Sequence, residues 1–180
     1  MKRRGVLATA SVCLAGSISG CQAVLSRRKY SEDTPLNELV LSAAELSEYR
    51  LSDERARGPT ASSYRLLGRA FEPNADATPP VAAELTSTAV VYRSANEAKE
   101  HAPGPVKDAL EGHPSVATKV SIGDYQAWRY RDYPGEGVYT ILDGNLGVGL
   151  TGRFEAGLTK TRWNYLRQHI ESVARRVVEL

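Results

Sequence analysis

Cysteine is scarce in this sequence, with two residues in a chain of 180. Two cysteines exclude both a disulfide framework and a zinc site built from cysteine. Glycine and proline, at 15 and 9 residues, are too few for a fibrous protein, and a hydrophobic share of 42% is too high for a disordered chain. The length predicts one domain with a tail and excludes a large barrel or a two-domain enzyme.

The first 20 residues have the pattern of an export signal. Lys2, Arg3 and Arg4 give a positively charged start, and no charged residue follows up to residue 20. The uncharged stretch of about 16 residues is shorter than the ~20 that a membrane-spanning helix needs. Arg3 and Arg4, followed after one position by two apolar residues, resemble the twin-arginine export motif. A Sec signal can begin in the same way, so both export routes stay open.

The tetrapeptide at 18–21, Ile-Ser-Gly-Cys, resembles a lipobox. An aliphatic residue stands three positions before the cysteine, two small residues precede it, and the thiol receives the lipid. Cys13 does not fit, because Val12 directly precedes it and the apolar region would be only about eight residues long. We therefore predict that residues 1–20 are a signal peptide with a lipobox and that Cys21 carries a lipid. An ordinary buried cysteine is the alternative.

Residues 21–38 are expected to form a tether, and residues 39–180 the folded domain. The signal contains three of the 23 Lys and Arg residues and none of the 21 acidic residues. The remainder of the chain therefore has 20 basic and 21 acidic residues. This balance argues against nucleic acid as a partner. The predicted partner is the membrane, reached through the lipid on Cys21. The cations at 27–29 would add ~1 kcal/mol each on an anionic bilayer, unless this segment is only a soluble linker.

Helical signals recur along the predicted domain. Ser42 and Glu45 have the spacing of a capping box and predict a short helix over 43–48. Ser94 is expected to begin a second helix, which the prolines beyond it interrupt and which Gly112 ends. Apolar residues at steps of three and four predict a long helix at 158–179 whose outer face is solvated.

The strand signals lie between these helices. Tyr49 is expected to open the first strand, followed by a polar turn at 53–62. Further strands are predicted at 64–71, 85–92, 116–120, 125–131, 138–142 and 146–151. The order predicts an α+β fold in which helices pack on one face of an antiparallel β-sheet and a C-terminal helix completes the domain.

Several turn and strand patterns in the predicted domain resemble those of a known protein family. They are the strand at 85–92 running into Ser-Ala-Asn-Glu-Ala, the turns at 123–124 and 143–145, and the closing helix. Together with the lipobox they resemble the small exported lipoproteins of haloarchaea, whose domain looks like the PsbP/Mog1-like α/β sandwich. The resemblance covers residues 39–180 and implies that the two turns are structural. The near-neutral charge departs from the acidic composition of proteins in saturated salt, so a bacterial lipoprotein of similar fold is the alternative source.

The sequence has no recognisable catalytic constellation. Residues 147–152 match G-x-G-x-x-G, but only 28 residues follow and they form the final helix, so we interpret the match as a glycine-alternating strand. His101, His113 and His169 share no metal-ligand spacing, and no G-x-S-x-G motif is present. We expect no metal, no cofactor and no enzymatic activity.

Aromatic and basic residues alternate over 128–131 in the strand at 125–131. Trp128 and Tyr130 are expected to point to one side of the sheet, and Arg129 and Arg131 to the other. These four residues are the candidate binding surface for a protein, a glycan or a small ligand. The alternative is a core row of aromatic residues with a solvated basic row behind it.

The predicted function is a non-catalytic role in binding or assembly, performed by a lipid-anchored protein that faces the outside of the cell membrane. One alternative is an extracytoplasmic hydrolase, which a Ser or Asp in a pocket beside one of the histidines would favour. Another is an accessory subunit of a membrane complex, by analogy with PsbP-like proteins. An exposed apolar patch on the sheet would favour that alternative.

Overall fold

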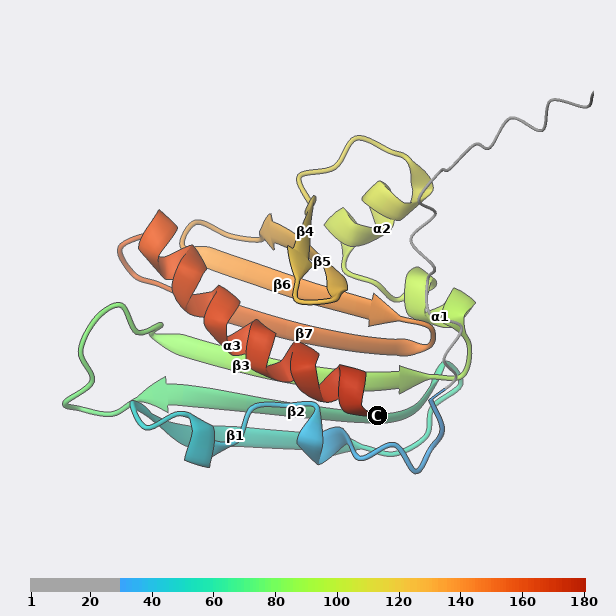
Figure 1. Cartoon of the computed structure of the whole chain (residues 1–180), viewed down its shortest axis with the longest axis horizontal. Helices are drawn as coiled ribbons and strands as arrows, with labels where there is room; N and C mark the ends of the chain where they lie inside the picture. Colours follow the sequence, from blue (N-terminus) through green and yellow to red (C-terminus); the bar gives the residue numbers. More distant parts are fainter. Residues whose placement is uncertain (1–29) are drawn as a thin grey trace, which may run out of the picture.

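The computed structural model describes residues 30–180, which form a seven-stranded antiparallel sheet in the order β1-β2-β3-β7-β6-β5-β4 (Figure 1). The strands are β1 (Tyr49–Arg57), β2 (Ser63–Pro73), β3 (Glu84–Tyr92), β4 (Thr118–Ile122), β5 (Tyr125–Arg131), β6 (Glu136–Asp143) and β7 (Leu146–Arg153). The α-helices are α1 (Ala95–Glu100), α2 (Gly104–Glu111) and α3 (Lys160–Glu179). The α+β class, the antiparallel sheet and the C-terminal helix are confirmed.

Two predicted elements have different boundaries in the structure. β1 continues to Arg57, so a turn starting at residue 53 is wrong. Eight of its nine residues are exposed because β1 is an edge strand, and the alternation that marks a half-buried strand is therefore missing. The helix predicted over 43–48 is a three-residue 3-10 helix, η2 (Ala43–Glu45), although the capping box of Ser42 and Glu45 is present.

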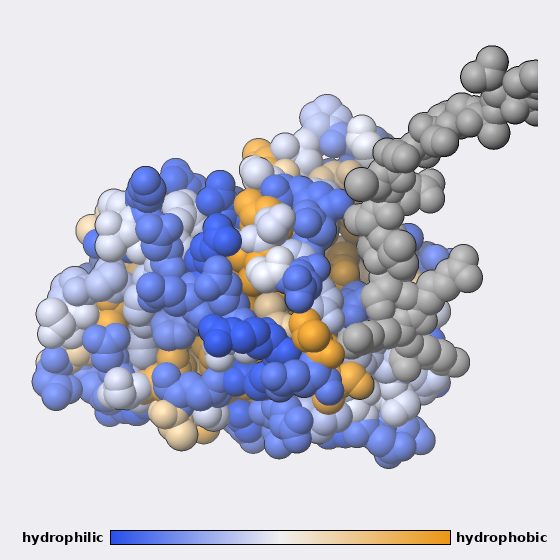
Figure 2. All heavy atoms as spheres, viewed as in Figure 1, coloured by the Kyte–Doolittle hydropathy of each residue, from blue (hydrophilic) through white to orange (hydrophobic). Residues whose placement is uncertain are grey.

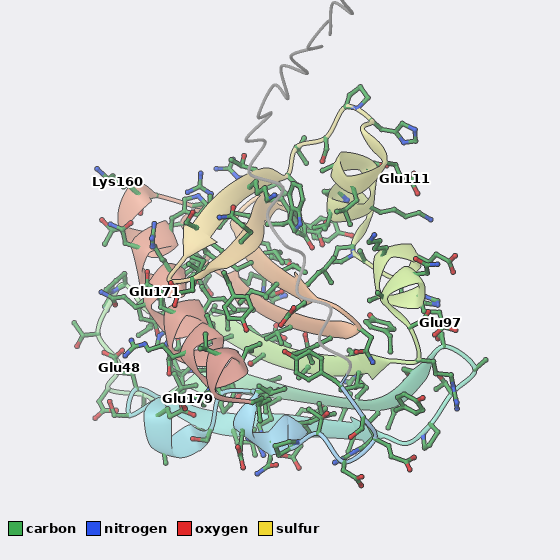
Figure 3. All side chains as sticks on the ribbon, turned by 45° about the vertical axis from the view of Figure 1, so that its right-hand side comes forward. Glu48, Glu97, Glu111, Lys160, Glu171 and Glu179 are labelled. Carbon is green, nitrogen blue, oxygen red and sulfur yellow. The ribbon has the colours of Figure 1, made fainter. Side chains whose placement is uncertain are left out.

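One face of the sheet, together with α3, contains the main hydrophobic core. The four residues of β3 on this face are all 0% exposed: Leu85, Ser87, Ala89 and Val91. α3 begins after Thr159, whose side chain accepts a hydrogen bond from the Arg162 N–H, and covers this face with five buried residues: Leu166, Ile170, Val173, Ala174 and Val177. Polar residues predominate on the surface of this side (Figure 2), and Figure 3 shows the labelled charged side chains spread over several elements at the periphery.

The helices α1 and α2 pack on the opposite face, so the prediction of helices on one face only is wrong. Val138 and Tyr139 are neighbours in β6 and point to opposite sides of the sheet. Tyr139 belongs to the main core, whereas Val138 lies in a second cluster with residues of α1–α2 and β5: Ala102, Val106 and Tyr130. The amphipathic pattern of a short helix shows that one side is buried. It does not show which face of the sheet that side meets.

Two glycines allow α3 to approach the sheet closely. Gly137 and Gly152 lie directly opposite each other on β6 and β7. A Cβ atom on Gly137 would lie 2.9 Å from Leu166 Cδ1, and one on Gly152 would overlap Leu166 Cδ2. The predicted glycine-alternating strand at 146–151 is confirmed. In the structure this strand is β7, which continues to Arg153, and its last glycine, Gly152, provides space for the helix.

The packed part of the chain begins earlier than predicted. Tyr30 is 6% exposed and Leu36, in the 3-10 helix η1 (Leu36–Glu38), is 1% exposed. Both belong to the main core, so a boundary between tether and domain at residue 39 is wrong. Residues 30–38 pack as irregular chain with one turn and the single 3-10 turn η1, so the sequence has no regular hydrophobic period there. No helix within residues 30–180 has the length and apolar character needed to cross a bilayer.

Candidate functional site

The side chain of Asn145 holds the backbone of Tyr30 at the turn between β6 and β7. Its Oδ1 atom accepts a hydrogen bond from the Tyr30 N–H at 2.7 Å, and its Nδ2 atom donates to the Tyr30 carbonyl at 2.9 Å. Nδ2 also donates to the Tyr92 carbonyl at 2.6 Å, at the end of β3. Asn145 is 2% exposed, so these bonds are shielded from water. The amide therefore binds both polar backbone groups of Tyr30, as a neighbouring strand would.

The side chain of Tyr30 is held by Asp143, the last residue of β6. The Tyr30 hydroxyl donates to Asp143 Oδ2 at 2.7 Å, and the Tyr125 hydroxyl donates to the same oxygen at 3.4 Å. Asp143 is 3% exposed, and a carboxylate at such a depth is tolerated only with hydrogen-bond donors around it. We call Asp143 and Asn145 the Tyr30 clamp, because together they bind this residue through its side chain and its backbone.

A tight turn places the two clamp residues side by side. Asp143 pairs directly with Leu146, so only Gly144 and Asn145 form the loop. Gly144 has φ +57°, as the first central residue of a type II′ hairpin turn requires. The sequence predicts this turn. It does not predict the clamp, because Asp and Asn beside a glycine are typical of any turn and the Tyr30 partner is 115 residues away.

A shallow groove of about 540 Å³ lies beside the segment that follows Tyr30. Residues 32–37 form one wall and the end of the β1–β2 hairpin forms the other, with apolar side chains from Leu36, Ala56, Pro59, Leu66 and Leu67. Arg65 fastens the two walls by donating to the Glu32 carbonyl at 3.0 Å. Within residues 30–180, no group of three or more His, Cys, Asp or Glu side chains is placed to hold a metal ion.

The four predicted surface residues do not form one surface. Tyr130 is 5% exposed in the second hydrophobic cluster, and its burial raises its pKa to about 12. Trp128 is half-buried beside it, with Lys119 Nζ 5.9 Å from the ring centroid. On the other side of the sheet, the Cζ atom of Arg129 lies 5.2 Å from the ring centroid of Trp163 in α3, while Arg131 is exposed. Arg3, Arg4 and Cys21 lie outside the described residues.

The three histidines lie in three different environments. His101, at the end of α1, stacks on Tyr92 with a centroid distance of 5.9 Å. At the surface, the Nδ1 atom of His113 lies 3.4 Å from Oε2 of Glu111. His169 packs edge-on against Tyr165 in α3 at 4.6 Å. In the described part of the chain, therefore, the histidines do not gather around one nucleophile.

His169 is the most constrained of the three. Its Nε2 atom is buried and has no hydrogen-bond partner within the described residues. Burial lowers the pKa of His169, and the nearby Glu45 carboxylate only partly offsets this. Burial alone would raise the pKa of Glu45, but hydrogen bonds from Arg176 and Ser42 lower it overall. The imidazole is therefore neutral in the folded protein near neutral pH.

We expect stability to fall as the pH is lowered from 7.5 to 5. The unfolded chain takes up a proton on His169 near pH 6.5, whereas the folded chain resists it, so the free energy of unfolding decreases with acid. Urea unfolding at several pH values measures this slope. Above pH 5 the Glu45 carboxyl, whose ordinary pKa is 4.5, adds little. His169→Gln should flatten the slope, whereas His113→Gln should leave it unchanged; an unchanged slope in His169→Gln would contradict the assignment.

Comparisons with known proteins assign the chain to no family. No protein-family model matches it, and no curated protein sequence matches it. Among solved structures, it is similar to the extracellular domain of PknH from Mycobacterium tuberculosis, with 10% identity and a TM-score of 0.45. The match covers 83% of this chain and 100% of that chain. The resemblance to haloarchaeal lipoproteins and to the PsbP/Mog1-like sandwich stays a prediction.

Proposed function

We propose that this protein is exported and held at the outer face of the cytoplasmic membrane by a lipid on Cys21, where its domain has a non-catalytic role in binding or assembly. The observation that carries the proposal is a spacing. Tyr30, the first residue bound by the clamp, follows Cys21 by nine positions. The cysteine of the lipobox thus lies just ahead of the packed body, where the attachment point of an anchored domain is needed.

The shape of the described surface supports binding rather than catalysis. The groove beside residues 32–37 is open and mostly apolar, and the three histidines lie apart from it and from one another in the fold. The large exposed hydrophobic residues of the described chain are dispersed over four segments: Leu51, Val116, Tyr133, and Val178 with Leu180. Neither the hydrolase nor the subunit of a membrane complex has a specific observation in its favour.

The proposal predicts that Cys21→Ala abolishes lipid attachment. In the source cell or a close relative, the wild-type protein should fractionate with membranes, and its intact mass should correspond to residues 21–180 plus a lipid. Cys21→Ala should lack the lipid mass, because no thiol is left to accept it. Cys13→Ala is the matched control and should behave like the wild type. A wild-type chain that still begins at Met1 without lipid mass would overturn the proposal.

A further inference from the structure

We propose that the end of the sheet that contains the Tyr30 clamp faces the phospholipid headgroups of the membrane, and that the opposite end points away from it. The proposal rests on the lipid at Cys21. It adds an orientation, which the anchor alone does not give. The argument has three parts: where the chain enters the fold, how long the connection is, and what lies at each end.

The entry point is fixed at one end of the sheet. The clamp binds Tyr30 beside the β6–β7 turn and the end of β3. The β1–β2 loop at 58–62 belongs to the same end, because the Arg93 N–H donates to the Ser62 carbonyl at 3.1 Å and Arg93 Nε donates to the Thr60 carbonyl at 2.9 Å. This clamp end, which also includes α1, is on the right in Figure 1.

The opposite end is equally well defined. It contains the β2–β3 loop at 74–83, the β5–β6 turn at 132–135 and the β7–α3 loop at 154–159. Phe154 N–H donates to the Gly135 carbonyl at 2.9 Å, and Ala83 N–H donates to the Arg153 carbonyl at 2.7 Å, so these loops are fastened together. β3, with nine residues, connects the two ends and is roughly 30 Å long at about 3.3 Å per residue.

The connection from Cys21 to Tyr30 can only just equal the length of β3 when it is fully extended. Nine residue steps span at most about 32 Å even when fully extended. The clamp end is therefore held near the lipid. Turning the opposite end to the bilayer would need the connection to use almost all of this reach along the length of β3.

The charged residues at the clamp end give it no strong affinity of its own for the membrane. Contact between this end and the headgroups would therefore come from the lipid anchor. Exposed cations at this end, Arg57, Arg93 and Lys99, alternate with acids such as Glu100. Such a mixed surface neither attracts nor strongly repels phospholipid headgroups. The lipid would therefore provide the affinity and the clamp the orientation, so we expect high salt to leave the orientation unchanged.

Energy transfer from a labelled cysteine to labelled headgroups tests the orientation. The lipidated protein is purified and reconstituted into vesicles of phosphatidylcholine and phosphatidylglycerol that carry a headgroup acceptor dye. Donor dyes are placed at Ala61→Cys, at the clamp end, or at Tyr133→Cys, at the opposite end, both exposed positions. Lipidated Cys21 has no free thiol to react. Transfer from position 61 should be at least about twofold more efficient than from position 133. Equal or reversed efficiencies overturn the proposal.

Two further measurements separate the possible failures. Flotation of the vesicles reports anchoring: protein that does not float refutes the lipid anchor, whereas floating protein with equal transfer refutes only the orientation. Ten Gly and Ser residues inserted between Lys29 and Tyr30 lengthen the connection without touching the clamp. This insertion should reduce the difference between positions 61 and 133. An unchanged difference would mean that surface contacts orient the domain, and the proposed role of the clamp and short connection would be wrong.

Discussion

Gly152→Val is expected to lower the free energy of unfolding by about 3 kcal/mol. A Cβ atom at position 152 would overlap Leu166 Cδ2 and lie 3.3 Å from Phe154 Cε2. Leu166 is 0% exposed, so its side chain has no free space in which to rotate away. The added side chain would therefore push α3 away from the sheet and weaken the main core. Urea unfolding followed by circular dichroism measures the change.

Gly58→Val is the matched control for this substitution. A Cβ atom on Gly58, in the β1–β2 loop, meets nothing within 4 Å. Its effect should stay within about 0.5 kcal/mol, the range of ordinary surface changes. Leu166→Ala removes the side chain that Gly152 accommodates, so Gly152→Ala should be less damaging in that background than alone. If the two substitutions act additively, the contact between Leu166 and Gly152 is not what limits residue size at position 152.

Asn145→Ala is expected to lower the free energy of unfolding by about 3 kcal/mol, because buried groups would lose their partners. The Tyr30 N–H and carbonyl and the Tyr92 carbonyl all bind this one amide. The loss should be local at first. Hydrogen exchange at the Tyr30 amide should accelerate more than exchange in α3 or β7, because the clamp holds only the start of the packed chain.

The exposed Asn164 of α3 supplies the matched control, Asn164→Ala. This variant should leave both stability and exchange at Tyr30 nearly unchanged. Asn145→Asp is a finer probe, because it keeps an acceptor for the Tyr30 N–H but loses the Nδ2 donor and adds a charge next to Asp143. It should also be destabilised. If Asn145→Ala unfolds like Asn164→Ala, the amide is not what fixes the N-terminal segment.

The burial of Tyr30 and its binding by the clamp could not be predicted from the sequence, for a physical reason. Residues 22–38 have no hydrophobic period. Their described part, 30–38, packs through single side chains such as Tyr30 and Leu36 rather than through one regular face. The residues that hold it, Asp143 and Asn145, look like ordinary turn formers. Only the closure of β6 and β7 brings them to Tyr30, and a separation of 115 positions leaves no local pattern.

The strands and helices, by contrast, could largely be predicted from local rules. Alternation in β3, the Gly144 turn and the three-and-four spacing of α3 each depend on residues close together in the chain. Even the opposite directions of Trp128 and Arg129 follow from strand geometry alone. The contacts of each side chain do not follow from strand geometry, because they depend on which element packs against that face of the sheet.

The sequence by itself determined the class of fold, most element boundaries and the motif at Cys21, because these depend on short-range periods and spacings. Tertiary structure decided that helices cover both faces of the sheet, that Gly152 accommodates Leu166 and that Tyr130 is buried. It also decided that Asn145 binds the backbone of Tyr30. Each of these features arises from contacts between separate elements of the fold, as the pairing of β3 with β7 does, and such contacts leave no local pattern in the sequence.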